Sequence, residues 1–109
     1  MSPREFLGEL EEMVLLAVLR LGADAYGASV LRELDEQAGR DVPRGSVYVT
    51  LDRLEEKGLI QSRAGEPTAQ RGGRAPRLVS VTAAGRAALR RTHEVRERLL
   101  EGLDGALGA

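Results

Sequence analysis

The chain has 109 residues, of which 42% are hydrophobic and 30% are charged, so it fits one globular domain and neither a fibrous repeat nor wholesale disorder. It has no cysteine, a single histidine (His93) and a single lysine (Lys57), which excludes disulfide frameworks and thiolate metal sites and disfavours most enzyme chemistry. We therefore expect no catalytic residue, no metal ligand and no cofactor.

The formal net charge of −1 is unevenly distributed. Residues 1–60 hold 7 basic and 12 acidic residues, whereas residues 61–98 hold 9 basic and 3 acidic residues. All the basic residues but Lys57 are arginine, whose planar guanidinium suits phosphate oxygens and guanine edges. A GC-rich coding sequence yields the same arginine-rich composition, so composition alone does not establish a nucleic-acid partner.

Neither a membrane span nor a secretion signal is indicated. The longest apolar run, Met13–Leu19, is far shorter than the roughly 20 residues that a membrane-spanning helix needs. The first twelve residues carry four glutamates and no apolar stretch of signal-peptide length. We expect a cytoplasmic protein with no membrane partner.

The first predicted helix begins at the capping box formed by residues 2–5 (Ser-Pro-Arg-Glu) and ends at Gly22. Within it, Met13–Leu19 is apolar around the whole circumference, so more than one side must be covered, and a second copy of the chain is one such cover. The acidic side chains on this helix are interpreted as a solvated face: Glu9, Glu11 and Glu12.

Two further helices follow in quick succession. The second spans Tyr26–Ala38, and the third begins just after Pro43 and ends at Lys57-Gly58. Both have an apolar face, comprising Val30, Leu31 and Leu34 in the second and Val47, Thr50, Leu51 and Leu54 in the third. Helices joined by so short a link are typical of a helix-turn-helix.

The pattern then changes to strands. Leu59–Arg63 and Pro76–Val81 read as the two strands of a hairpin, with a tip over Gly65–Ala75. Thr82 is the predicted cap of a last helix over Ala83–Leu103. One stripe of this helix is formed by Ala88, Thr92, Val95, Leu99 and Leu103.

This order of elements predicts an α+β fold, mostly α: a winged helix-turn-helix with a long C-terminal dimerisation helix. Residues 1–81 form the expected DNA-binding domain, and residues 82–109 form the dimerisation helix with a frayed tail, all within one compact unit. The third helix is expected in the DNA major groove and the hairpin tip at phosphate or in the minor groove.

The outward side of the third helix holds the residues that we expect to read DNA: Arg44, Ser46, Tyr48, Val49 and Arg53. Arginine serves phosphate or guanine, and a serine hydroxyl or tyrosine phenol reaches phosphate. The alternative for Arg53 is an ion pair with Asp52 or Glu56, and the alternative for Tyr48 is a cap on the core.

The expected wing contacts are Arg71, Gly72, Gly73, Arg74 and Arg77. Glycines let the backbone approach a groove closely, and arginines on a narrow tip suit the negative minor groove. A solvated, positively charged loop is the alternative.

The sequence resembles the PadR-like transcriptional regulators, specifically the short members with a single C-terminal helix. The resemblance is carried by Tyr26-Gly27, the block over residues 45–60 and Gly72-Gly73-Arg74 leading to Val81-Thr82-Ala83-Ala84-Gly85. It implies a homodimeric repressor on an inverted-repeat operator, with double-stranded DNA as partner and release by a small-molecule effector near the dimer interface. It also implies that the last helix packs on the partner's N-terminal helix, which gives the interface as Leu10, Val14, Val95, Leu99 and Leu103.

One alternative of a different class is a winged-helix module that binds another protein and no DNA. It is favoured by acidic residues on the third helix that would repel phosphate if they faced it: Asp52, Glu55 and Glu56.

Overall fold

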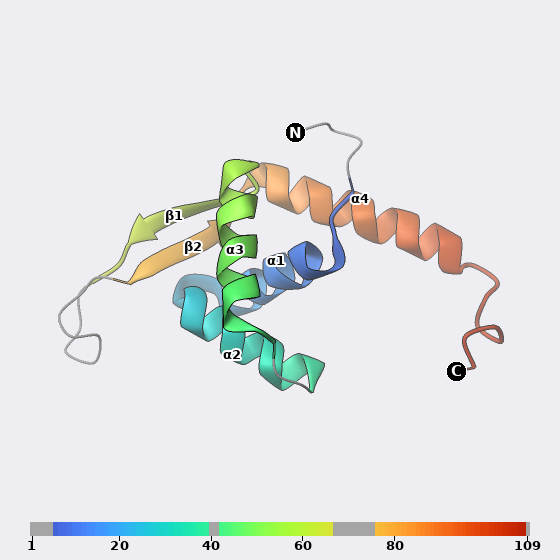
Figure 1. Ribbon diagram of the computed structural model, residues 1–109. Coiled ribbons are helices and arrows are strands. Elements are labelled where there is room, and N and C mark those ends of the chain that lie inside the picture. The colour runs from blue at the N-terminus through green and yellow to red at the C-terminus, as the bar shows by residue number, and fades with distance from the viewer. Residues whose placement is uncertain (1–5, 40–41, 67–75, 109) are drawn as a thin grey trace.

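The helices and strands follow the predicted order in a computed structural model that describes residues 6–39, 42–66 and 76–108 (Figure 1). They are α1 (Glu9–Leu21), a short 3-10 turn (Gly22–Asp24), α2 (Gly27–Ala38), α3 (Arg44–Glu56), β1 (Ile60–Ala64), β2 (Arg77–Val81) and α4 (Ala83–Leu100). The chain is mostly helical, with a two-stranded antiparallel sheet, as the sequence predicts.

The core lies where α1, α2 and α3 meet, and the base of the hairpin and the first turns of α4 close it. Each of the predicted inward faces of α2 and α3 is turned to this core, with Leu31 only half-buried. The largest fully buried side chains are Leu15, Leu51, Leu54, Leu59, Ile60, Val14, Val30 and Val47.

The hairpin is antiparallel, in a register that runs from Ile60↔Val81 at its base to Ala64↔Arg77 at its outer end. The Val79 N–H donates to the Ala25 carbonyl at 2.9 Å, so the link before α2 attaches to the free edge of β2. This bond fixes the hairpin to α1, α2 and α3, which we call the helical body.

A close contact joins α4 to the body. Thr82 caps α4 by accepting a hydrogen bond from the Gly85 N–H at 3.1 Å, and its hydroxyl donates to the Gly58 carbonyl at 2.7 Å. A Cβ at Gly85 would lie 2.2 Å from the Leu59 carbonyl oxygen, so only glycine allows α4 to pass this close to the chain before β1.

The first and the last helix, α1 and α4, are both shorter than the sequence predicts. Helix α1 begins at Glu9 and not near Ser2; residues 2–5, the predicted capping box, lie outside the described residues. The acceptor at the helix start is Glu11, which takes the Gly8 N–H at 2.9 Å. Helix α4 ends at Leu100, three residues early, and turns follow, in which Gly102 has a φ of 78° that favours glycine.

The acidic face of α1 is also corrected, because two of its three glutamates are buried. Glu11 binds Lys57 (Oε2 to Nζ, 2.7 Å), and Glu12 binds Arg96 (Oε1 to Nη1, 2.9 Å). Burial by itself raises the pKa of Glu11, but the hydrogen bonds from Lys57 and Gly8 outweigh it and hold that pKa below its ordinary value. These glutamates attach α1 to the end of α3 and to α4.

The molecule is elongated, with extents of 53 × 31 × 21 Å, because the hairpin and α4 leave the body in opposite directions (Figure 1). Among the described residues, no helix combines the length and apolarity needed to cross a membrane.

Candidate nucleic-acid interface

Helix α3 turns a polar side outward beside the hairpin. Four of the five residues predicted to read DNA are exposed on it, namely Arg44, Ser46, Val49 and Arg53. The fifth, Tyr48, is half-buried and packs against the core. No ion pair of Arg53 is found within the described residues, so the predicted alternative of a partner in Asp52 or Glu56 is not what the structure has.

Tyr48 has a structural role as well as an outward edge. Its ring lies over Gly27, where a Cβ would approach the ring to 2.2 Å. The Arg44 guanidinium lies over the Tyr48 ring, with its Cζ 5.7 Å from the ring centroid, within cation–π range. The ring therefore joins the start of α2 to the first turn of α3 and orients Arg44.

The predicted wing is described only in part. Arg71, Gly72, Gly73 and Arg74 lie outside the described residues. Arg77 is placed, at the start of β2, and its guanidinium points to α3: Nη1 donates to Asp52 Oδ1 at 3.0 Å and Nη2 donates to Glu55 Oε1.

Glu55 takes a second hydrogen bond from the hairpin. The Ser62 hydroxyl, on β1, donates to Glu55 Oε2 at 2.8 Å. The hydrogen bonds from Ser62 and then Arg77 hold the pKa of the Glu55 carboxyl below its ordinary value, and Glu55 in turn raises the pKa of Arg77. We call Asp52, Glu55, Ser62 and Arg77 the hairpin clamp.

The hairpin clamp bears on the predicted repulsion between α3 and phosphate. Two of the three acidic residues, Asp52 and Glu55, are paired with Arg77, so their charge is partly neutralised within the chain. The sequence pattern did not indicate this pairing, because Arg77 lies 25 and 22 residues from its two partners.

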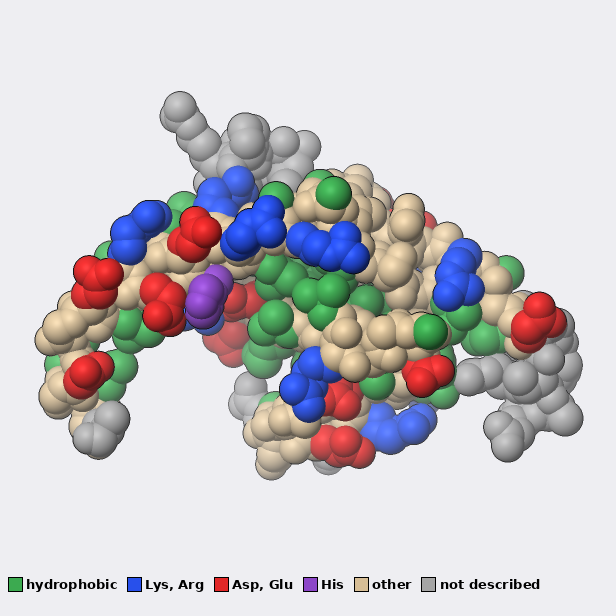
Figure 2. Space-filling view, turned by 180° about the vertical axis from the view of Figure 1, so that it is seen from behind, with side chains coloured by type: hydrophobic (Ala, Val, Ile, Leu, Met, Phe, Trp, Pro, Cys, Tyr) green, Lys and Arg blue, Asp and Glu red, His purple; other side chains and the backbone are tan. Residues whose placement is uncertain are grey.

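Exposed apolar side chains lie along the outer half of α4 and on α1. Of the predicted interface residues, Leu99 is 71% exposed, Leu103 is also exposed, and Val95 and Leu10 are half-buried. Val14 is 0% exposed and belongs to the chain's own core, so its prediction as an interface residue is wrong. The exposed apolar residues of α1 are Leu16 and Leu19. Figure 2 shows hydrophobic side chains beneath the outer half of α4, which we call the α4 arm, and across the adjoining helical body.

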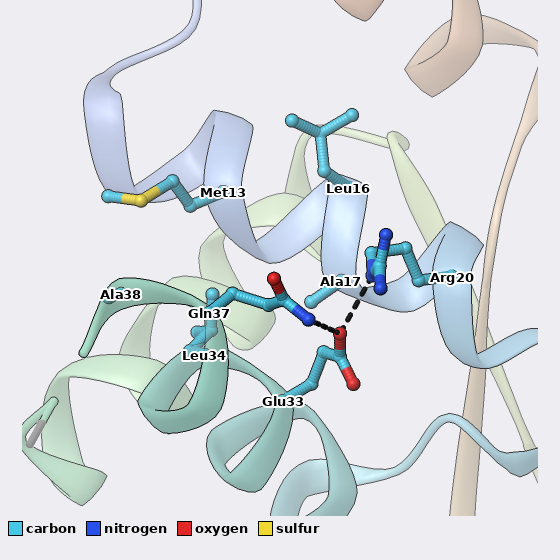
Figure 3. A pocket seen from close by; sticks show the side chains of 8 residues that line it. All are labelled: Met13, Leu16, Ala17, Arg20, Glu33, Leu34, Gln37 and Ala38. Atoms are coloured by element: carbon cyan, nitrogen blue, oxygen red, sulfur yellow. Dashed lines mark hydrogen bonds and ion pairs between the residues drawn. The ribbon is translucent and has the colours of Figure 1, made fainter. Parts of the chain in front are cut away.

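Two hollows border these apolar surfaces. One, of about 360 Å³, lies between Phe6, Leu7 and the outer half of α4. The other, of about 250 Å³, lies between α1 and α2, with Met13, Leu16 and Leu34 among its lining residues (Figure 3). Its polar rim is Glu33, which accepts from Arg20 at 2.7 Å and from Gln37 at 3.1 Å. Both hollows are open to solvent on the single chain.

An exposed α3 beside a two-stranded hairpin, with a following helix, defines a winged helix-turn-helix protein. The family model described as the transcriptional regulator PadR-like family matches residues 15–91, well over half of the chain. The chain therefore belongs to the PadR-like family of transcriptional regulators, as the resemblance in sequence suggested.

Solved structures of the same fold are similar over nearly the whole chain. A PadR-like transcription factor from Bacteroides fragilis ("bacteroid fragilis") is 23% identical, with a TM-score of 0.70 over 89% of this chain and 88% of that one. A PadR-like regulator from Bacillus cereus is 19% identical, with a TM-score of 0.73 over 92% of each chain. A PadR family regulator from Eggerthella lenta is 24% identical, with a TM-score of 0.68 over 91% and 86%. No curated protein matches the chain in sequence.

Proposed function

We propose that the chain is a homodimeric repressor that binds an inverted-repeat operator, with α3 of each copy in the major groove. The observation that carries the proposal is that one chain has both an outward polar side on α3 and an uncovered apolar stripe on α4. The first suits a nucleic acid, and the second suits another copy of the chain.

The exposed side of α3 suits base edges and phosphates. Arg44 and Arg53 supply cations for phosphate or guanine, and Ser46 supplies a hydroxyl near the positive end of the helix. Val49, exposed at mid-helix, suits the methyl group of thymine.

The α4 stripe supports the dimer. Leu99 and Leu103 lie beyond the part of α4 that packs on the body, and Leu16 and Leu19 of α1 leave a second apolar surface uncovered. Exposed apolar surfaces are typical of interaction sites. In a two-fold dimer with α4 packed on the partner's α1, the two α3 helices would lie about 34–36 Å apart, one turn of DNA.

The proposal extends to a small-molecule effector. The hollow between Phe6, Leu7 and α4 is lined mainly by apolar side chains and adjoins the proposed dimer contact. An apolar effector held there between the two copies would change their relative orientation and so release the operator. Titration of the purified protein on its DNA with apolar compounds tests this: release at a saturable concentration supports the effector site, and release unaffected by Leu99→Phe in the hollow contradicts it.

DNA binding is tested with a labelled duplex from the chain's own promoter region, a random duplex of the same length as competitor, and two salt concentrations. The proposal expects tight, competitor-resistant binding that weakens with salt by about one unit of log–log slope for each phosphate contact. Equal and weak binding to both duplexes contradicts a sequence-specific repressor and favours the protein-binding alternative.

The dimer is tested with Leu99→Asp, which places a carboxylate in the apolar stripe. We expect monomers on a sizing column and loss of operator binding. The matched control is His93→Asp, which adds the same charge at an exposed position of α4 about 120° around the helix from Leu99. A Leu99→Asp protein that remains dimeric contradicts the interface.

A further inference from the structure

We propose that Glu55 and Asp52 are positioning residues for DNA binding, which fix the orientation of the β1–β2 hairpin relative to α3 through Arg77 and Ser62. The inference rests on the proposed function, because it gives the hairpin clamp a part in presenting the hairpin and α3 to the same duplex.

The inner face of the hairpin changes character along its length. Ile60 and Val81 pair at the base and are buried in the core, and Val79 at the next inward position is buried too. The same face also presents Ser62, directly opposite Val79, and Arg77, one pair farther out, and neither belongs to the core. Apolar packing therefore holds the hairpin as far as Val79, and the outer pair Ala64↔Arg77 lies outside the core.

Polar contacts to α3 hold the outer part. Glu55 accepts from one residue of each strand, Ser62 of β1 and Arg77 of β2. Asp52, one helical turn earlier, accepts from the other terminal nitrogen, Nη1, of the same guanidinium at 3.0 Å. Since a guanidinium is planar and rigid, two acceptors on one helix fix its direction and with it the end of β2.

The clamp is a weak source of global stability, since all three charged side chains are substantially exposed. Its effect is on geometry: it sets the angle between the helix that reads the major groove and the hairpin beside it. A two-part binding surface loses affinity when its parts no longer fit the duplex together, even if each part is intact.

Electrostatics and positioning predict opposite signs for the same substitution. If Asp52 and Glu55 merely repel phosphate, removal of their charge strengthens DNA binding. If they position the hairpin, removal of their charge weakens DNA binding. The sign of the change therefore decides between the two roles.

The experiment compares the full-length wild-type chain with Glu55→Gln, Asp52→Asn and the double variant on the labelled promoter duplex. We expect each single variant to bind roughly three- to fivefold more weakly, with an unchanged salt slope because no phosphate contact is lost. The matched control is Glu56→Gln, which removes the same charge from the adjacent exposed position of α3 and is expected to bind as tightly as wild type or slightly more tightly. Glu55→Gln binding at wild-type strength or better overturns the inference.

A role for Arg77 as a direct phosphate contact is distinguished by Arg77→Gln. A phosphate contact predicts a salt slope lower by about one unit, together with stronger binding by Glu55→Gln, and this pair of results overturns the inference. Positioning predicts that Arg77→Gln and Glu55→Gln each weaken binding and that the double variant is no weaker than the worse single one.

Amide hydrogen exchange measures the clamp without DNA. We expect faster exchange in β1 and β2 of Glu55→Gln, with α1 and α2 unchanged and with no such effect in Glu56→Gln. Unchanged exchange in the hairpin overturns the inference. Failure of the wild-type chain to bind the promoter duplex contradicts the proposed function instead, and the exchange result then decides on the clamp by itself.

Discussion

The helical body and the α4 arm are built from similar residues but solve burial differently. In the body, leucines such as Leu54 are completely enclosed by the chain's own helices. On the outer half of α4, Leu99 and Leu100 stay exposed, Leu99 at 71%. The comparison teaches that one periodic pattern produces a finished core where other elements surround it and an open apolar surface where none does.

The largest expected effect comes from a matched pair of leucine deletions. Leu54→Ala leaves a cavity in the body and is expected to lower the free energy of unfolding by about 2–5 kcal/mol at any protein concentration. Leu99→Ala is expected to cost under about 0.5 kcal/mol in dilute protein and more at concentrations where dimers form. Urea unfolding at two protein concentrations measures both, and equal costs in dilute protein contradict the division between body and arm.

The joint between body and arm is tested with Gly85→Ala. The added Cβ would lie 2.2 Å from the Leu59 carbonyl oxygen, so α4 has to shift, at an expected cost of about 1–3 kcal/mol in thermal or urea unfolding. Gly45→Ala in α3 is the control, because nothing lies within 4 Å of its Cβ position, and alanine favours a helix. A tolerated Gly85→Ala contradicts the close passage of α4.

A smaller effect is expected from the ion pair that joins α1 to α3. Glu11→Gln removes the charge from a carboxylate whose side chain is only 11% exposed and leaves Lys57 without its partner. We expect a loss of about 1–2 kcal/mol in the free energy of unfolding. Glu9→Gln, at an exposed position of the same helix turn, is expected to change nothing measurable.

The smallest effect is a dependence on pH. The pKa values of Glu11, Glu33 and Glu55 all lie below the ordinary 4.5 in the folded chain, so their charged forms favour folding. That contribution is complete above pH 4.5 and is lost as the pH falls below 4.5 and through the lowered folded-state values. Melting temperatures between pH 7 and pH 3 measure the loss, and Glu11→Gln should show a shallower one.

Much of the fold was predictable because it depends on local patterns. The spacing of Val47, Leu51 and Leu54 gave the inward face of α3, and Pro43 and Lys57-Gly58 gave its ends to within a residue. The outward side of α3 followed as the complement of that face. The start of α1 was less predictable, because residues 2–5 place a glutamate three residues after the predicted cap, as Gly8 and Glu11 do at the helix start in the structure.

The partners of charged residues were not predictable. Glu11 binds Lys57, which is 46 residues away in the sequence, and Arg77 binds Asp52, which is 25 residues away. Neither separation corresponds to a helix or strand period, so the sequence pattern does not indicate these pairs. Arg77 was therefore predicted as a DNA contact, and Glu11 was predicted to be solvated. Val14 illustrates the same limit for apolar residues, since a helix that is apolar all round does not indicate which side its own chain will cover.

The sequence by itself determined the order of the elements, the faces that α2 and α3 turn inward, and membership of the PadR-like family, because helix and strand periodicity and turn residues act over a few neighbouring positions. Only the tertiary structure decided which carboxylates are paired, how the hairpin is held against α3 and which leucines of α4 stay uncovered. Those outcomes depend on where elements distant in the chain cross, and the crossing is set by packing of the whole core.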